Sequence, residues 1–153
     1  MSSLQEVWLH DDKISGTLPT QLGRWTEFMY TFQIQGNALT STVPTQLGTW
    51  SNMRYGLVLN SNSMSGTIPT ELGHLTGFTG GTNNWQTFNL HANAFSGAVP
   101  TELGRLSALS SGFFLASNDL CSAIPTELAA LSSALASSPS ASGVEKRITL
   151  SPP

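Results

Sequence analysis

The side chains that are able to bind a metal ion or to move a proton are few in this chain and scattered along it. His10, Asp11 and Asp12 are adjacent, and imidazole and carboxylate groups serve as metal ligands and as acid–base pairs. The only cysteine, Cys121, excludes an internal disulfide and a cysteine-based zinc site, and we expect it to be a small buried residue. The remaining residues of this kind form no catalytic motif, so we predict no catalytic residues, no metal and no cofactor.

The composition points away from nucleic acids and membranes. Nine acidic and six basic residues give a net charge of −3, and Lys146 and Arg147 are the only adjacent bases, which is too few for a basic patch. No apolar run approaches the roughly 20 residues that span a bilayer. Residues 1–10 lack the basic and apolar regions of a signal peptide. The sequence therefore predicts an intracellular soluble subunit, or an extracellular protein if its start is truncated.

One stretch of nine residues occurs five times in slightly different forms. The copy SGTIPTELG spans residues 65–73, and the prolines of successive copies are separated by 25, 25, 31 and 25 residues. A period of this size predicts a solenoid, in which each coil buries its apolar face only against its neighbours. The five prolines that set the period are Pro19, Pro44, Pro69, Pro100 and Pro125.

Each repeat also contains alternating apolar residues followed by an asparagine. The alternation is typical of β-strands and predicts short strands at 32–34, 57–59, 88–90 and 113–115. The amide after each strand carries donors and an acceptor, so it is able to bond the backbone of adjacent coils. Asp12, at the same position of the first coil, has no amide donors. The predicted asparagine ladder consists of Asn37, Asn62, Asn93 and Asn118.

Units such as LVLNSNSMSGTIPTELGHL at 57–75 resemble the plant-type leucine-rich repeat, whose pattern is LxxLxLxxNxLSGxIPxxLGxL. The match covers roughly residues 4–131. It implies an α/β repeat solenoid with short parallel strands on the concave face and short helical or 3-10 turns on the back. The unit here has one residue more than the common one, which predicts a small bulge or a wider turn before each strand. The glycine four residues after the proline, replaced by Ala129 in the last copy, is expected to end the helical turn.

In this family the concave sheet binds ligands through strand residues that point away from the core. The resemblance implies a first column of Trp8, Gln33, Val58, Asn89 and Phe114, and a second of His10, Gln35, Asn60, His91 and Ala116. The face is rich in amides and nearly uncharged, which suits hydrogen bonding to a peptide or a glycan. The alternative is that Trp8 and Phe114 only stack on the end coils. His10 and His91 would stand about 14–16 Å apart, too far to share an ion.

The unit with 31 residues carries an insertion around 79–87, with Asn83, Asn84 and Trp85. Insertions in solenoids often form binding loops, so we predict a second contact with a partner here. The alternative is a tolerated surface loop whose tryptophan packs back on the core.

Two regions are predicted: a solenoid at 1–131, and a Ser/Ala-rich linker and tail at 132–153. The first coil has no capping segment, so we expect either a longer protein or a partner over this end. The tail is expected to be disordered in isolation, although Ile148 and Leu150 are able to add a short strand.

The sequence predicts a non-catalytic protein–protein interaction module with one or more protein partners. It would be a small subunit or recognition fragment that docks on a larger assembly through the concave sheet, the insertion or the tail. The alternative is a glycan- or peptide-recognition fragment of a receptor-like or secreted inhibitor protein. A further alternative is ice binding, because a regular row of threonines resembles ice-binding faces. The row also has a structural explanation, since threonine suits the first turn of a helix, which its hydroxyl is able to cap. The row consists of Thr20, Thr45, Thr70, Thr101 and Thr126.

Overall fold

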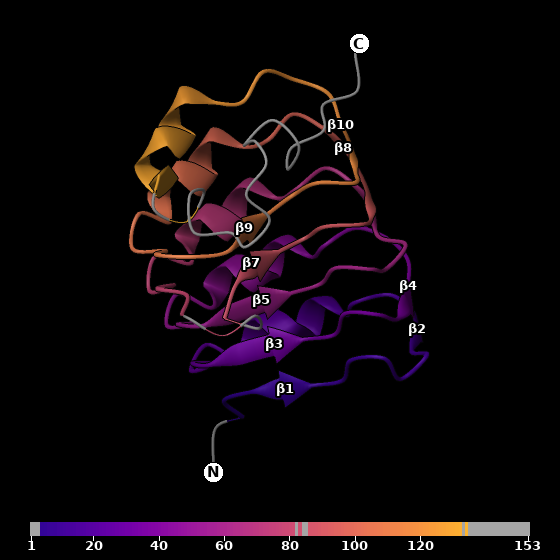
Figure 1. The fold of residues 1–153 in the computed structure, drawn as a ribbon. Helices are drawn as coiled ribbons and strands as arrows, with labels where there is room; N and C mark the ends of the chain where they lie inside the picture. The colour runs from indigo at the N-terminus through magenta and orange to yellow at the C-terminus, as the bar shows by residue number, and fades with distance from the viewer. Residues whose placement is uncertain (1–3, 82, 84–85, 133, 135–153) are drawn as a thin grey trace.

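The computed structural model of the protein describes residues 4–81, 83, 86–132 and 134, which wind through five stacked coils (Figure 1). Each coil contributes one strand to a parallel sheet in the order β1-β3-β5-β7-β9, in which neighbouring strands pair at equivalent positions of the repeat. The predicted leucine-rich repeat solenoid with short parallel strands is confirmed. The strands are β1 (Val7–Trp8), β3 (Thr31–Gln33), β5 (Gly56–Val58), β7 (Phe88–Asn89) and β9 (Phe113–Phe114).

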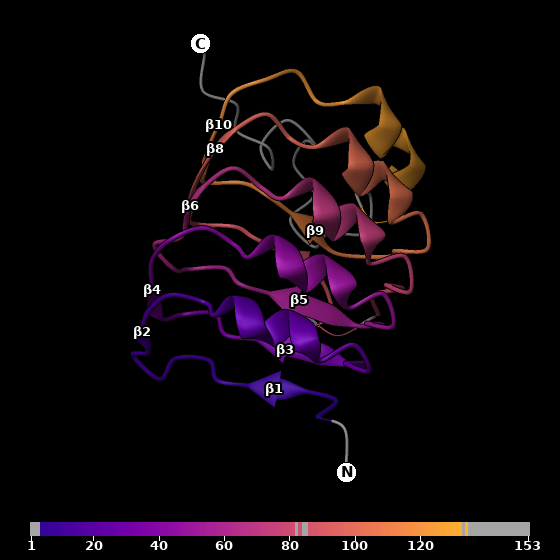
Figure 2. The same cartoon turned by 180° about the vertical axis from the view of Figure 1, so that it is seen from behind.

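Five 3-10 helices form the back of the solenoid, on the opposite side from this sheet (Figure 2). Each begins directly after a proline, which is extended before the first four helices, so the threonine occupies the first helical position. None of these helices has a side-chain cap, so the expected capping role of the threonine hydroxyl is wrong. The hydroxyl of Thr101, for example, donates to the Glu102 carboxylate at 3.3 Å. The helices are η1 (Thr20–Arg24), η2 (Thr45–Thr49), η3 (Thr70–His74), η4 (Thr101–Arg105) and η5 (Thr126–Leu131).

The glycine at the fourth position after each of the first four prolines lies inside its helix and does not end it, which corrects our expectation. The next coil packs directly on this glycine. A methyl group on Gly73 would come within 2.3 Å of the carbonyl oxygen of Glu102, and one on Gly48 within 2.5 Å of that of Glu71. Glycine is therefore required because the backs of consecutive coils approach closely.

A second set of short strands runs along one side of the solenoid and was not predicted (Figure 1). They form two parallel sheets, β2-β4 and β6-β8-β10. The chain bends here through the Ser-Gly dipeptides, and Gly16 and Gly66 have φ of 95° and 80°, which glycine adopts without steric cost. The strands are β2 (Ser15–Gly16), β4 (Ala38–Leu39), β6 (Ser65–Gly66), β8 (Ala94–Gly97) and β10 (Asp119–Leu120).

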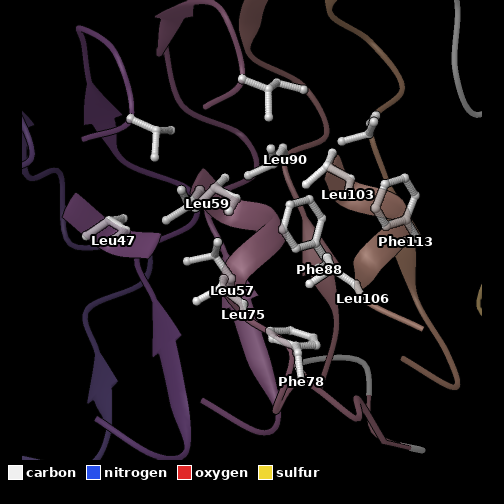
Figure 3. Close-up of a cluster of buried hydrophobic side chains, with 14 of the residues drawn as sticks. Leu47, Leu57, Leu59, Leu75, Phe78, Phe88, Leu90, Leu103, Leu106 and Phe113 are labelled. Carbon is white, nitrogen blue, oxygen red and sulfur yellow. The ribbon is translucent and has the colours of Figure 1, made fainter. Parts of the chain in front are cut away.

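One hydrophobic cluster fills the space between the sheet and the helices (Figure 3). Leu57, Phe88 and Leu75 are fully buried in it, and burial of each such side chain stabilises the fold by about 1.5–3 kcal/mol. Trp50 is also fully buried, and its Nε1 donates to the carbonyl oxygen of Leu22 at 3.0 Å, so its polar group is paired. No helix in the described part of the chain has the length and apolar character needed to cross a membrane.

The asparagines after the strands join each coil to the one before it. Nδ2 of Asn118 donates to the carbonyl oxygen of Leu90 at 3.0 Å in the preceding coil and to that of Leu115 at 2.9 Å in its own. Oδ1 of Asn118 accepts from the backbone N–H of Phe95 at 3.0 Å. Each amide therefore uses its donors and its acceptor together, which a carboxylate is unable to do. The other asparagines that bond in this manner are Asn37, Asn62 and Asn93.

The residues just before the strand of the third coil share one acceptor of the preceding coil. The N–H groups of Tyr55 and Gly56 both point to the carbonyl oxygen of Tyr30, at 3.1 and 3.3 Å. Gly56 still pairs one to one with Thr31, and the rings of Tyr30 and Tyr55 stack with centroids 5.8 Å apart. The bulge or wider turn expected before each strand therefore stays a prediction.

Candidate functional site

The strand residues that point away from the core form what we call the sheet face, the concave face of the sequence prediction. Strand pairing joins Trp8 to Gln33, Gln33 to Val58, Val58 to Asn89 and Asn89 to Phe114. The five residues therefore form one row across all coils, in the predicted order. Trp8 is the most open of them, with 44% of its surface exposed, whereas Asn89 and Phe114 are half-buried.

Gln33 and Val58 are much less open than we expected. They are 1% and 3% exposed, although Val58 is not part of the hydrophobic core cluster. Gln33 lies between Trp8 and Val58 in the strand ladder, and hydrogen bonds to neighbours on its own chain segment hold its amide. The prediction that these two side chains are open to a partner is therefore wrong, and Gln33 has an internal role.

A chain of side-chain hydrogen bonds runs along the third strand of the sequence, β3, and just beyond it. Oγ1 of Thr31 donates to the carbonyl oxygen of Gly56 at 3.2 Å, and Nε2 of Gln33 donates to Oγ1 of Thr31 at 3.4 Å. Nε2 of Gln35 donates to Oε1 of Gln33 at 3.4 Å. Sequence reasoning missed Thr31, which is completely buried. The available signal was its position two residues before Gln33, on the same side of the strand.

The second predicted row is also aligned from coil to coil. The carbonyl oxygens of Gln35, Asn60, His91 and Ala116 accept from equivalent N–H groups of the coil before each of them. The side chain of His10 is 46% exposed, and the other four residues are half-buried. Nδ2 of Asn60 donates to Oγ of Ser61 at 3.1 Å, which uses one of its two hydrogens.

A histidine and a carboxylate lie together at the first coil of the sheet face. Nδ1 of His10 and Oδ2 of Asp11 are 3.1 Å apart, in an exposed pair. Exposed pairs of this kind contribute little to stability, because water screens them. Among the residues that the structure describes, no three His, Cys, Asp or Glu side chains gather as metal ligands would. From the second coil onward, the two rows contain no Asp, Glu, Lys or Arg.

The insertion is described in part. Asn83 is exposed, and its backbone N–H donates to Oε1 of Gln86 at 3.1 Å, while the N–H of Gln86 donates to the carbonyl oxygen of Asn83 at 2.9 Å. A hydrogen bond from the Ser111 hydroxyl to the carbonyl oxygen of Gly81 joins this loop to the next coil. Asn84 and Trp85 lie outside the described residues, as do residues 135–153 of the tail, so the contacts predicted for them stay predictions.

Cys121 is exposed, so our expectation that it is buried is wrong. It follows β10 and stands at the position that serine or threonine occupies in the other copies of the nine-residue stretch. The side chains at this position point outward in all five coils, because the core residue of each segment lies one position earlier, as Leu120 does here.

Comparison with known proteins supports the same fold. No model of a protein family and no curated protein matches the chain significantly. The LRR ectodomain of the Arabidopsis thaliana receptor kinase GASSHO1/SCHENGEN3, solved with CASPARIAN STRIP INTEGRITY FACTOR 2, is 27% identical with a TM-score of 0.75, over 86% of this chain and 15% of that chain. The BIR3–SERK2 complex from Arabidopsis thaliana is 26% identical with a TM-score of 0.68, over 84% of this chain and 64% of that chain. A plant ice-binding protein is 22% identical with a TM-score of 0.68, over 82% of this chain and 38% of that chain.

The chain spans less than two thirds of the length of these matched structures. Its repeat and its fold are those of plant-type leucine-rich repeat proteins, so the resemblance seen in the sequence is confirmed. It is a non-catalytic leucine-rich repeat module, comparable to the ectodomain of the plant protein BIR2, to which it is 27% identical.

Proposed function

We propose that this chain is a protein-binding module that recognises its partner through the sheet face. The proposal rests mainly on the two aligned rows of strand side chains, which contain no Asp, Glu, Lys or Arg from the second coil onward and include the half-exposed Trp8 at one end. Tryptophan is enriched among the residues that dominate protein interfaces, and amides supply hydrogen bonds without the desolvation cost of a buried charge.

Two similar structures support a protein as the partner. GASSHO1/SCHENGEN3 was solved with a bound factor, and BIR3 was solved in a complex with SERK2. By analogy, this chain is a recognition fragment or a small subunit that docks on a larger assembly, with the insertion and the tail as further contacts. A glycan is the alternative ligand for the same face, because a sugar ring is able to stack on Trp8.

The test is a selection of binders from a displayed library of random peptides, followed by affinity measurements with a triple variant. Trp8→Ala, Gln35→Ala and His91→Ala together remove one aromatic ring and two polar groups from the sheet face. We expect the selected peptides to bind this variant at least about tenfold more weakly, a loss of about 1.4 kcal/mol, since aromatic anchors carry much of the binding energy of an interface.

The matched control changes three exposed residues on the back, Thr20→Ala, Gln46→Ala and Thr126→Ala. This variant is expected to bind as the wild type does. Equal binding by the sheet-face variant and the wild type would contradict the proposal, and weakened binding by the back variant alone would move the site to the helices.

A second candidate function is ice binding, through a different face from the threonine row first considered. The row after the prolines is interrupted by charge, because the hydroxyls of Thr70, Thr101 and Thr126 each donate to a glutamate. The side formed by β2, β4, β6 and β8 instead exposes small hydroxyl and methyl groups in successive coils, and a plant ice-binding protein has the same fold. These exposed residues are Ser15, Thr17, Thr40, Thr42, Ser65, Thr67, Ser96 and Ala98.

Thermal hysteresis of the purified chain tests this candidate. If this side binds ice, the wild type lowers the freezing point below the melting point, and Thr42→Lys with Thr67→Lys abolishes the gap because long charged side chains break the flat surface. The sheet-face triple variant is expected to keep the full hysteresis. A wild type without hysteresis, or a lysine variant with undiminished hysteresis, would remove ice binding as a candidate.

A further inference from the structure

One hydrogen-bond acceptor on the sheet face has no donor in the described part of the chain. Oε1 of Gln35 is buried, and none of the residues that the structure describes donates a hydrogen bond to it. Buried polar atoms in folded proteins are nearly always paired, and an unpaired one calls for an explanation. The Gln35 side chain as a whole is half-buried at the surface of the sheet, so a bound partner supplies the missing donor once the atoms that cover this oxygen move aside.

The chain of side-chain hydrogen bonds fixes which atom of the Gln35 amide is left unpaired. The carbonyl oxygen of Gly56, at the inner end of the chain, only accepts, so the hydroxyl of Thr31 must donate to it. The hydroxyl oxygen of Thr31 then accepts from the NH₂ group of Gln33, which turns the oxygen of Gln33 toward Gln35. That oxygen needs a donor, so it faces the NH₂ group of Gln35.

The outer end of the chain is therefore a carbonyl oxygen and not an NH₂ group. If the Gln35 amide were turned over, two oxygens would face each other and the chain would lose a hydrogen bond. The backbone carbonyl of Gly56 in β5 thus fixes the direction of every hydrogen bond in the chain. Through Thr31 and Gln33, it determines which atom of Gln35 lies at the outer end. The alternating positions of Thr31, Gln33 and Gln35 on one side of the chain make this transmission geometrically direct.

We propose that Oε1 of Gln35 is a specificity-determining acceptor that selects a neutral N–H donor of an extended polypeptide. This inference rests on the proposed function, in which a protein binds the sheet face. A carboxylate or a phosphate has no hydrogen to donate and would face a carbonyl oxygen, so such groups are rejected here. An ammonium group would lose its hydration at a buried atom, so it is disfavoured as well.

The neighbouring coil supplies the complementary group. Asn60 stands next to Gln35 in the second row, and after its bond to Ser61 one amide hydrogen has no acceptor among the residues that the structure describes. A polypeptide backbone carries an N–H and a C=O within each peptide unit, so the acceptor of Gln35 and the donor of Asn60 suit it together. Thr31, which is completely buried, acts as a positioning residue that does not touch the partner.

The test uses two small probes that differ by one hydrogen-bond donor. N-methylacetamide is a single peptide unit with an N–H, and N,N-dimethylacetamide is the same unit without it. Each is titrated into the ¹⁵N-labelled full chain while the side-chain amide signals of Gln35 and Asn60 are followed by NMR. We expect N-methylacetamide to move both signals and N,N-dimethylacetamide to leave the Gln35 signal in place.

Variants of Thr31 separate positioning from simple structural support. Thr31→Val keeps the shape of the side chain but removes the hydroxyl that fixes the polarity, so the response of Gln35 to N-methylacetamide should weaken about 2- to 10-fold. Thr31→Ser keeps the hydroxyl and is expected to restore the response. The backbone spectrum reports in the same experiment whether each variant is folded.

Equal responses to the two probes, or no response to either, would overturn the assignment of Gln35. A response to methyl glucoside in place of N-methylacetamide would overturn the polypeptide and identify a glycan as the partner. The probes require no natural partner. The experiment is therefore able to contradict the acceptor role of Gln35 without contradicting the proposed binding of a protein, and the reverse also holds. If the probes are discriminated but no library peptide needs the sheet face, the acceptor site stands and the proposed protein partner falls.

Discussion

Replacement of Gly73 by alanine is expected to destabilise the protein by about 3 kcal/mol or more, the upper end of the cost of overpacking. The added methyl group would lie 2.3 Å from the carbonyl oxygen of Glu102 and 2.8 Å from its Cβ. These atoms belong to η4, which packs in turn on η5, so they are not able to move aside as the end of a flexible side chain would. Relief of the contact requires two coils to separate, and separation exposes core residues on both sides.

Ala129 provides the matched control for this substitution. It occupies the equivalent position in η5, is exposed, and contacts no further coil among the described residues. Ala129→Gly is expected to cost only about 0.5–1 kcal/mol, the ordinary penalty of glycine in a helix. Urea unfolding followed by circular dichroism measures both effects. If Gly73→Ala has a urea midpoint as high as that of Ala129→Gly, the close approach of the coils does not constrain this position.

The architecture was predictable because a single coil carries the whole pattern. The spacing of the prolines gives the period, and the alternation around Leu57 and Leu59 gives the strand. Since every coil repeats the pattern, the pairing of strands follows without knowledge of any contact, and the two rows of the sheet face follow from it. The role of the asparagine after each strand was predictable for the same reason. In every coil that carries it, its amide pairs backbone N–H and C=O groups that would otherwise lack partners.

The features that the sequence did not predict depend on contacts between coils or on individual side chains. The requirement for Gly73 comes from a carbonyl group of the next coil, which no local rule about helix ends describes. The burial of Gln33 and the chain that begins at Thr31 are confined to one coil, so no periodic pattern reveals them. Cys121 was expected inside on the basis of residue type, but its position in the repeat points outward.

Replacement of Asn118 by aspartate is expected to destabilise the protein by about 3 kcal/mol or more, a cost typical of an unpaired buried charge. Only 8% of Asn118 is exposed. Its NH₂ group faces the carbonyl oxygens of Leu90 and Leu115, at 3.0 and 2.9 Å. A carboxylate would lose both hydrogen bonds and would set a negative charge against these oxygens. The N–H of Phe95 would remain a partner for one carboxylate oxygen, which offsets only part of this cost.

The first coil supplies the reverse substitution as a control, because Asp12 stands at the position of the ladder and is exposed. Asp12→Asn is expected to change the free energy of unfolding by less than about 0.5 kcal/mol, as exposed substitutions usually do. Urea unfolding at several pH values shows how much of the destabilisation of Asn118→Asp comes from the negative charge and how much from the changed hydrogen-bonding groups. A protonated carboxyl group is neutral and regains one O–H donor, so the deficit relative to the wild type should shrink as the pH falls and grow as the pH rises. A deficit that is the same at all pH values would mean that the charge is not what the ladder excludes.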